Sequence, residues 1–369
     1  MNLKKALAAS TALVSVFAVA APAFAQTDLT ALYEAAKTEG QLTTIALPHD
    51  WCGYGAVIDG FKAKYPGITI NELNPDAGSG DEIEAVKTSK GNAGPQSPDV
   101  IDVGLSFGPS AKADGLIQAY KVSTWDSIPD SAKDADGFWY GDYYGVLSFL
   151  VNTDIVSKVP TSWAELKASD YANSFALAGD PRAANQAISA VHAAGLATGA
   201  AAGADAAKAG LAFFADLNKA SNFVPVIGKA AAVAQGTTPI VAAWDYNALA
   251  WRDGFAGNPK AEVVVPSDAV VAGVYVQAIS AYAPHLNAAK LWMEYLYSDE
   301  GQTGWLAGYC HPIRFNDMVA RKVVPQALLD KLPPADAYAK AVFPTLDEQA
   351  AAKTEITGQW DAVVGANVQ

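Results

Sequence analysis

The hydrophobic pattern changes its period twice between residues 42 and 73. Residues 42–47 form an apolar, β-branched run that is too short for a helix and therefore predicts a strand. After a polar loop, apolar side chains recur at three- and four-residue spacing from Val57 to Tyr65, which predicts a helix with one buried face. Residues 68–73 return to the strand pattern. A strand, a helix and a second strand in this order predict a parallel β-α-β unit.

The same succession of strand, polar turn and helix recurs three times further along the chain. Predicted strands at 99–103, 174–178 and 240–243 each lead into a turn and a helical pattern. Parallel strands bring such turns to one edge of a sheet, where open α/β sheets bind ligands. The sequence therefore predicts an α/β protein whose ligand contacts come from loops after strands, above all from the loop 48–54.

Residues 1–25 have the pattern of a secretory signal peptide. Lys4 and Lys5 precede a mostly apolar segment at 6–21, and Ala23-Phe24-Ala25 is a small-x-small cleavage site. The apolar segment is too short for a membrane anchor, and no later stretch reaches the roughly 18 apolar residues that a spanning helix needs. Cleavage would leave 344 of the 369 residues, more than one core usually holds. We therefore expect an exported protein with two lobes.

The composition excludes several classes of function. The formal net charge is −13 and the basic residues do not cluster, so no nucleic-acid partner is expected. The sequence has no Gly-x-Ser-x-Gly elbow, no His-Glu-x-x-His helix and no phosphate-binding loop, so we expect neither an enzyme nor a cofactor. The acidic balance favours a soluble monomer, but it does not identify a ligand.

Two cysteines, Cys52 and Cys310, lie far apart in the sequence and allow two interpretations. In an exported chain, a single pair favours a disulfide, because cysteines oxidise outside the cytosol. The alternative is a zinc site formed by His49, Cys52, Cys310 and His311, since sulfur and nitrogen donors suit zinc.

Five short segments follow one another in a characteristic order behind the signal peptide. Together they resemble the periplasmic solute-binding proteins of ABC importers, in the group that contains the spermidine/putrescine, iron(III) and thiamine binders. The resemblance covers nearly all of the mature chain. The segments are FKAKYPGI at 61–68, SPDVID at 97–102, Val151-Asn152 with VPTSWAEL at 159–166, GDPR at 179–182, and AAKLWMEYL at 288–296 with SDEGQ at 298–302.

The resemblance implies a two-lobed periplasmic binding protein fold of type 2. Each lobe would be a mainly parallel sheet flanked by helices, and two crossover strands, near 145–151 and 270–279, would join the lobes. The solute would bind between the lobes and pass to a membrane permease in the periplasm. The implied division is a first lobe at 26–145 plus 276–330, a second lobe at 146–275, and a C-terminal helical segment at 331–369 that packs on the lobes.

The resemblance also implies positions for the solute contacts. Trp244 is the strongest candidate, because a matching tryptophan in the polyamine binders stacks on the ligand. Simpler roles stay open for several others: a core position for Trp51 and Tyr275, a helix cap for Ser106, and an ion pair within the turn for Asp180 and Arg182. The full candidate set is His49, Asp50, Trp51, Tyr54, Ser106, Asp180, Arg182, Trp244, Asp245, Tyr246, Tyr275 and His311.

The class of solute is predicted from the positions at which this sequence differs from the family pattern. Polyamine binders carry an acidic residue where this chain has Val274-Tyr-Val-Gln277, and the tyrosine pair Tyr143-Tyr144 comes too early for an iron(III) site. His49, Arg182, His311 and Arg314 could all face the cleft, which favours an anionic or zwitterionic organic solute. The alternatives are a polyamine or other organic cation, and a metal ion, either iron or zinc.

Overall fold

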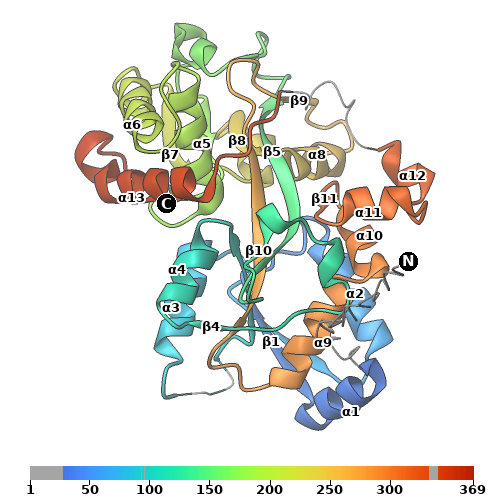
Figure 1. Cartoon of the computed structure of the whole chain (residues 1–369). Coiled ribbons are helices and arrows are strands. Elements are labelled where there is room, and N and C mark those ends of the chain that lie inside the picture. Colours follow the sequence, from blue (N-terminus) through green and yellow to red (C-terminus); the bar gives the residue numbers. More distant parts are fainter. Residues whose placement is uncertain (1–27, 93, 95, 332–339) are drawn as a thin grey trace, which may run out of the picture.

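The predicted β-α-β unit begins the fold. The computed structural model describes residues 28–92, 94, 96–331 and 340–369, so the predicted signal peptide lies outside the described residues. Strand β1 (Gln41–Ile45) pairs in parallel with β2 (Thr69–Leu73), and α2 (Tyr54–Lys64) connects them. Helix α1 (Leu29–Glu39) precedes the unit, and Figure 1 shows these elements at one end of the molecule.

The first lobe extends this unit with segments from both ends of the chain. The backbone N–H of Asp99 donates to the Thr43 carbonyl at 2.8 Å, which places β3 beside β1. Helix α9 returns late in the chain and packs on α1. The further elements are α3 (Ser79–Thr88), β3 (Val100–Gly104), α4 (Phe107–Ala113), β4 (Ile117–Gln118), two 3-10 turns (Trp125–Ser127 and Asp130–Ala132), α9 (Leu286–Leu296), α10 (Asp299–Ala307), β11 (His311–Pro312), α11 (Phe315–Ala320) and α12 (Gln326–Leu329).

The second lobe has a parallel core of its own in the strand order β8-β6-β7. Helices α5 and α6 cover it, and the C-terminal helix α13 packs on both of them (Figure 1). The elements are two 3-10 turns (Ala164–Lys167 and Ser169–Tyr171), β6 (Phe175–Leu177), α5 (Asn185–Leu196), α6 (Ala204–Lys219), β7 (Phe223–Ile227), α7 (Ala230–Ala234), β8 (Ile240–Trp244), α8 (Asp245–Gly254), β9 (Ala261–Val264) and α13 (Leu346–Val363).

Two long strands, β5 (Tyr140–Asn152) and β10 (Ala272–Ser280), run through both lobes. Residues 140–146 of β5 pair antiparallel with β10, and residues 147–151 then pair with β8 of the second lobe. Strand β10 also pairs with β3 of the first lobe. These strands occupy the segments expected to cross between the lobes, and we propose that the boundaries at 145/146 and 275/276 fall within them.

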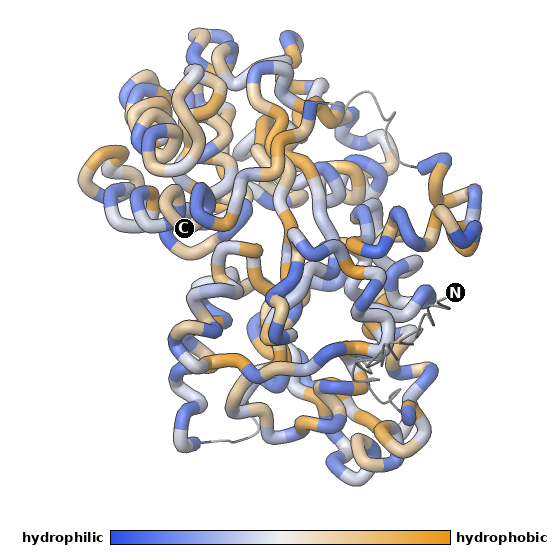
Figure 2. Tube along the Cα trace, viewed as in Figure 1, coloured by the Kyte–Doolittle hydropathy of each residue, from blue (hydrophilic) through white to orange (hydrophobic). Residues whose placement is uncertain are grey.

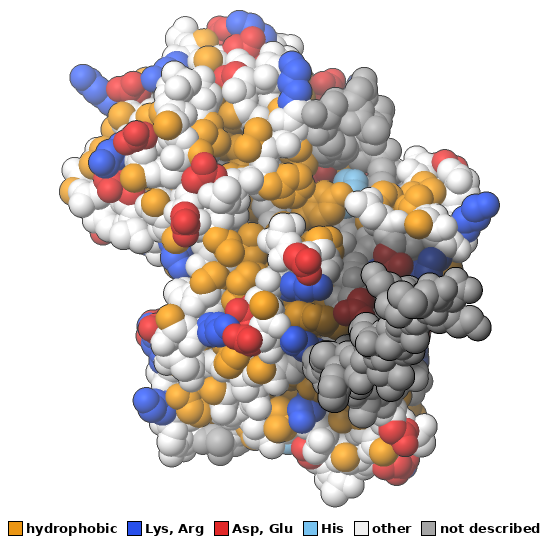
Figure 3. All heavy atoms as spheres, in the orientation of Figure 1, with side chains coloured by type: hydrophobic (Ala, Val, Ile, Leu, Met, Phe, Trp, Pro, Cys, Tyr) orange, Lys and Arg blue, Asp and Glu red, His pale blue; other side chains and the backbone are white. Residues whose placement is uncertain are grey.

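Hydrophobic positions follow this architecture. Figure 2 shows them concentrated along the central strands, with hydrophilic positions on the outer helices and loops. Strand β5 is buried at every position except Tyr144, which is partly buried, as expected for a strand covered on both faces. On the face shown in Figure 3, hydrophobic side chains also gather where the two lobes meet. Within the described ranges, no helix combines the length and apolar character needed to cross a membrane.

Candidate functional site

A cavity of about 410 Å³ lies between the two lobes. Its wall combines the loop after β1, the N-terminal turn of α3 and strand β3 with the turn that leads into α5, so both sheets contribute the loops at their strand ends. This is the position that open α/β sheets use for ligands. The polar, charged and aromatic lining residues are Trp51, Asp76, Ser79, Asp81, Glu82, Asp102, Asp180, Asn185, Gln186, Lys229 and Tyr275.

The lobes touch each other around this cavity. The backbone N–H of Gly80 in the first lobe donates to the Ala183 carbonyl of the second at 3.2 Å. Lys229 lies 3.7 Å from the Asp76 carboxylate. Outside the cavity, the Trp251 indole donates to the Asp50 carboxylate at 3.0 Å. The structure therefore shows the lobes in contact.

Aromatic side chains from the loop after β1 and from β5, α8 and β10 pack together at one wall. The Trp51 indole donates to the Tyr143 hydroxyl at 2.7 Å, and its ring meets those of Tyr246 and Tyr275 edge-on at 5.4 and 5.3 Å between centroids. Tyr275 stacks on Tyr143 with an interplanar angle of 12°. Trp51 and Tyr275 line the cavity, and the other two rings lie behind them. Such packing fixes the orientation of the two rings that a ligand would meet.

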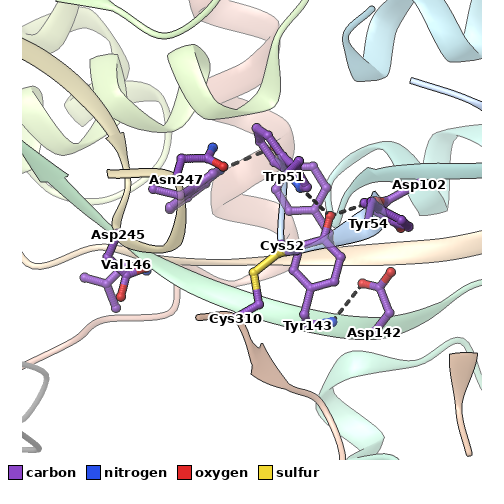
Figure 4. Close-up of a disulfide and its surroundings, with 12 residues drawn as sticks. Trp51, Cys52, Tyr54, Asp102, Asp142, Tyr143, Val146, Asp245, Asn247 and Cys310 are labelled. Carbon is purple, nitrogen blue, oxygen red and sulfur yellow. Dashed lines mark hydrogen bonds between the residues drawn. A yellow bond between two sulfur atoms is a disulfide. The ribbon is translucent and has the colours of Figure 1, made fainter. Parts of the chain in front are cut away.

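Asp102 places a buried carboxylate at the base of the cavity, with 5% of the residue exposed. Its Oδ2 accepts hydrogen bonds from the hydroxyls of Tyr54 and Tyr143 at 2.7 and 2.6 Å (Figure 4). Its Oδ1 is buried and accepts no hydrogen bond from the described residues. Burial raises the pKa of Asp102 to about 7, although the two tyrosine hydrogen bonds act in the opposite direction.

Two more buried carboxyl groups lie beside Asp102. Glu82 accepts the backbone N–H of Asp102 at 2.9 Å, and its pKa is raised by burial and by the negative charge of Asp102. Asp142 accepts a hydrogen bond from the Gln277 amide at 3.0 Å, and burial followed by the charge of Asp102 raises its pKa also. The three groups disfavour one another's ionised forms, because like charges at low dielectric repel strongly.

Three of the candidates from the sequence line the cavity, namely Trp51, Asp180 and Tyr275. The Asp180 carboxylate is held by the Arg182 guanidinium, with Nε–Oδ1 and Nη2–Oδ2 distances of 2.9 and 2.8 Å. The turn that leads into α5 is therefore fixed by an ion pair at the cavity wall.

Tyr54, Trp244, Asp245 and Tyr246 are buried behind the cavity wall instead. Trp244 ends strand β8 and is fully buried against Gly273, where a Cβ atom would come within 2.3 Å of the indole. Trp244 therefore does not line the cavity in this structure, and its ring supports Tyr275, to which its Nε1 donates at 3.4 Å. A direct contact of Trp244 with the solute stays a prediction. Asp245 accepts the backbone N–H of Val146 at 2.9 Å.

Four further candidates lie away from the cavity. His49 lies at the surface, 2.6 Å from the Glu72 carboxylate, and Asp50 bonds to Trp251. His311 stacks on Tyr144 with 4.9 Å between the ring centroids. Ser106 is buried at the start of α4, and its carbonyl accepts a hydrogen bond from Lys353 at 3.3 Å.

The basic residues expected to face the cleft do not line the cavity. Besides Asp180, Arg182 binds Asp361, Asn367 and the Val368 carbonyl at the C-terminal end. Arg314 is buried in the first lobe, where it donates to the Tyr297 carbonyl at 2.6 Å. Among the described lining residues, Lys229 is the one cation, against five carboxyl groups: Asp76, Asp81, Glu82, Asp102 and Asp180. The four basic residues therefore do not support an anionic solute.

The cysteines form a disulfide, as the exported character of the chain predicts. Cys52 and Cys310 are bonded with 5.4 Å between their Cα atoms, within the reach expected for a disulfide (Figure 4). The bond joins the loop after β1 to the segment after α10, both in the first lobe. Because both sulfurs are used in this bond, the alternative zinc site with His49 and His311 is contradicted.

The sequence reasoning missed Glu82 and Asp102. Both carried a readable signal: Asp102 interrupts an otherwise apolar strand, and Glu82 shares the inward face of α3 with Val86. Acidic side chains are seldom buried unless they have partners, so an acid at a core position deserves a functional explanation. Asn185 and Gln186, at the start of α5, were missed because polar residues at a helix start are equally typical of a helix cap and of a cavity wall.

The comparisons with known proteins agree with this geometry. Residues 96–339 match the model of the bacterial extracellular solute-binding protein family. The match covers more than half of the chain, so the protein belongs to this family, whose members are exported solute-binding proteins of ABC transporters. No curated protein matches the sequence.

Solved structures share the two-lobed fold at low sequence identity. The periplasmic binding protein AfuA from Actinobacillus pleuropneumoniae, with fructose-6-phosphate bound, is 20% identical over 88% of this chain and 98% of its own, with a TM-score of 0.68. MotA from A. tumefaciens B6, in complex with glucopine, is 16% identical over 88% and 99%, with a TM-score of 0.69. A ferric binding protein from Campylobacter jejuni is 19% identical over 87% and 99%, with a TM-score of 0.63. The fold is therefore that of type 2 periplasmic binding proteins.

Proposed function

We propose that this protein captures a small organic solute in the cavity between its lobes and delivers it, unchanged, to the membrane permease of an ABC importer. The observation that carries the proposal is the cavity itself, which is built from strand-end loops of both lobes. Its volume of about 410 Å³ lies within the range of small-molecule sites. The protein would act in the periplasm as a monomer without catalysis.

The charges that line the cavity support a solute with a positive group. Five carboxyl groups and one lysine line the described wall, and the lysine lies 3.7 Å from Asp76. Although burial raises the pKa of Glu82 and Asp102 and Arg182 pairs with Asp180, the wall offers a purely anionic solute little positive charge. An organic cation or a zwitterion fits this balance better. Among the described residues, no group of three or more histidine, cysteine, aspartate or glutamate side chains could hold a metal ion, so no observation favours the iron or zinc alternative.

Capture and release would follow from the connection between the lobes. Strands β5 and β10 are the long ladder that both lobes share, so a bend within them would open the cavity without breaking either core. The contacts Gly80–Ala183 and Lys229–Asp76 would part in an open form. A bound solute that touches both lobes would favour the closed form by its differential affinity.

A thermal unfolding screen tests the proposal. Polyamines, amino acids, phosphonates, sugar phosphates and ferric ion are added one at a time to the mature protein, and the solute is afterwards recovered and weighed by mass spectrometry. A true solute stabilises the folded state by about 2.7 kcal/mol at one hundred times its Kd and is recovered intact. The proposal is wrong if no compound raises the Tm, or if the recovered molecule is a reaction product.

A further inference from the structure

One buried oxygen of a cavity-lining residue, Oδ1 of Asp102, has no hydrogen-bond partner among the described residues. Asp102 is 5% exposed and lines the cavity, and its Oδ1 accepts no hydrogen bond from the described residues. The other carboxylate oxygen already accepts two, from Tyr54 and Tyr143. Leaving a buried acceptor unsatisfied costs about 1–3 kcal/mol, and more for a charged group. Such an atom, in a residue that lines the cavity, can still accept a hydrogen bond.

No cation among the described residues donates to Asp102. The groups that act on Asp102, Glu82 and Asp142 are other carboxyls, tyrosines, the Gln277 amide and backbone N–H groups. The titratable groups that interact with Asp102 come from α2, α3, β5, α8, β10 and the end of α9. They are Tyr54, Glu82, Asp142, Tyr143, Tyr246, Tyr275 and Tyr297. The ionised form of a buried carboxyl group is stabilised by a positive charge, and none of the described groups that act on Asp102 carries one.

The surrounding rings suit a positive charge. Trp51 and Tyr275 line the same cavity, and the hydrogen bonds from Trp51 to Tyr143 and from Tyr143 to Asp102 connect this wall to the carboxylate. The faces of tryptophan and tyrosine attract cations, most strongly in sites from which water is removed. The carboxylate of Asp102 and the rings of Trp51 and Tyr275 would therefore all favour a positively charged group of a ligand.

We propose that Asp102, with Glu82 beside it, binds a protonated amine of the solute. The inference rests on the proposed function, because it concerns the same cavity. An ammonium group carries three donors on one compact charge, so one of these donors can bind the free carboxylate oxygen of Asp102. The amine could belong to a diamine or to an ω-amino acid, since both present the same ammonium group.

The binding should be linked to protons, because the carboxyl group titrates near neutral pH. With its pKa at about 7, Asp102 in the free protein is largely protonated below pH 7. An ammonium group requires the ionised form, so amine binding releases a proton at acid pH. The affinity should therefore fall by up to about tenfold for each pH unit below 7 and level off above it.

Four probes with the same four-carbon chain test the inference by isothermal titration of the mature protein: 1,4-diaminobutane, 4-aminobutanoate, 1,4-butanediol and succinate. We expect at least one of the two amines to bind, and the diol and the diacid not to bind. The two amines distinguish a cationic from a zwitterionic solute. The variant Asp102→Asn should weaken amine binding at least tenfold and abolish the pH dependence.

The matched control is Glu84→Gln, which removes one charge from the exposed face of α3, where Glu84 pairs with Lys87. It should bind amines as the wild type does. Thermal unfolding without solute checks that Asp102→Asn folds, and Glu82→Gln, expected to weaken amine binding also, serves as the second variant. A solute without an amine that binds the wild type and Asp102→Asn equally overturns the inference and leaves the proposed function intact. If no compound of the thermal unfolding screen raises the Tm and none of the four probes binds in the titration, both are overturned.

Discussion

At the scale of single residues, two tryptophans with similar positions in the sequence pattern differ in whether they line the cavity. Trp51 and Trp244 both follow a strand pattern, yet only Trp51 lines the cavity. Trp51 belongs to a loop, where its ring can lie against Tyr275 while its indole bonds to Tyr143. Trp244 is the last residue of β8, and its ring is packed against Gly273. We therefore expect the aromatic contacts for a solute to come from Trp51 and Tyr275, with Trp244 packed against Tyr275.

Arg182 gives a prediction at this scale. Because its guanidinium binds Asp180, Asp361, Asn367 and the Val368 carbonyl, Arg182→Ala should lower the free energy of unfolding by about 1–3 kcal/mol. Solute affinity should change less than threefold, and urea unfolding and calorimetric titration measure the two quantities. Arg252→Ala is the control, since Arg252 pairs with its neighbour Asp253 at a more exposed position and should cost under about 1 kcal/mol. A large loss of affinity at unchanged stability would show that Arg182 contacts the solute.

At the scale of elements, α5 and α6 pack so closely that glycine is required where they cross. A Cβ atom on Gly195 would lie 1.7 Å from the Ala206 carbonyl oxygen, and one on Gly210 would lie 2.0 Å from the Val191 carbonyl oxygen. Both contacts are with backbone, so no side-chain rotation relieves them. Helix α5 begins at the cavity wall with Asn185, so this packing also positions the site.

A pair of glycine variants tests this packing. Gly195→Ala should lower the free energy of unfolding by about 1–3 kcal/mol or more, because the helices must move apart. Gly358→Ala adds the same methyl group to α13, where nothing lies within 4 Å, and should raise stability by about 0.5–1 kcal/mol through helix propensity. Chemical denaturation of both variants gives the comparison. Equal effects of the two substitutions would contradict the role of close packing.

The disulfide supports a second prediction about elements. It closes a loop with a sequence separation of 258 residues, so its removal in Cys52→Ser/Cys310→Ser should cost about 5–6 kcal/mol in the chain-entropy account. Since both cysteines belong to the first lobe, solute affinity should change less than threefold. Calorimetric unfolding and solute titration measure the two effects. Loss of binding in a variant that still unfolds cooperatively would mean that the bond also positions the cavity loop.

At the scale of the whole molecule, the two lobes are joined by two strands and held together by contacts that a hinge motion would break. The bond from Trp251 to Asp50 is one of these, and the bond from Tyr309 to Asp253 is another. Both link the first lobe to α8 of the second. If the lobes open and close as proposed, the strength of these bonds would contribute to the balance between open and closed forms, and hence to the lifetime of the bound state.

Trp251→Phe tests this balance by removing one donor between the lobes while keeping an aromatic ring. We expect solute affinity to fall about two- to tenfold, chiefly through faster dissociation, because the lost bond is worth about 0.5–1.5 kcal/mol. Stopped-flow fluorescence gives the two rate constants, and small-angle scattering reports the closure. Trp163→Phe is the control, because Trp163 is buried within the second lobe beside Phe149 and should leave both rates unchanged. Equal dissociation rates in wild type and Trp251→Phe would contradict a part for this bond in closure.

The sequence by itself determined the features that depend on local patterns. The first β-α-β unit and the α/β class follow from hydrophobic period, and the disulfide follows from a lone cysteine pair in an exported chain. The crossover segments follow from the family resemblance. Loops after strands meet at a sheet edge for a general geometric reason, which is why Trp51 and Asp180 could be found in advance. The family follows from segments whose order survives low overall identity.

Only the tertiary structure decided which side chains face the cavity and with what charge. Arg182 could face a solute or the C-terminus, and its partners at Asn367 and Val368 lie far away in sequence. Asp102 and Glu82 come from different elements, and their burial beside Asp142 is what raises their pKa values. The net charge of a site depends on groups that long-range contacts bring together. The spacing of residues along the chain does not give the distances between these groups in the folded protein.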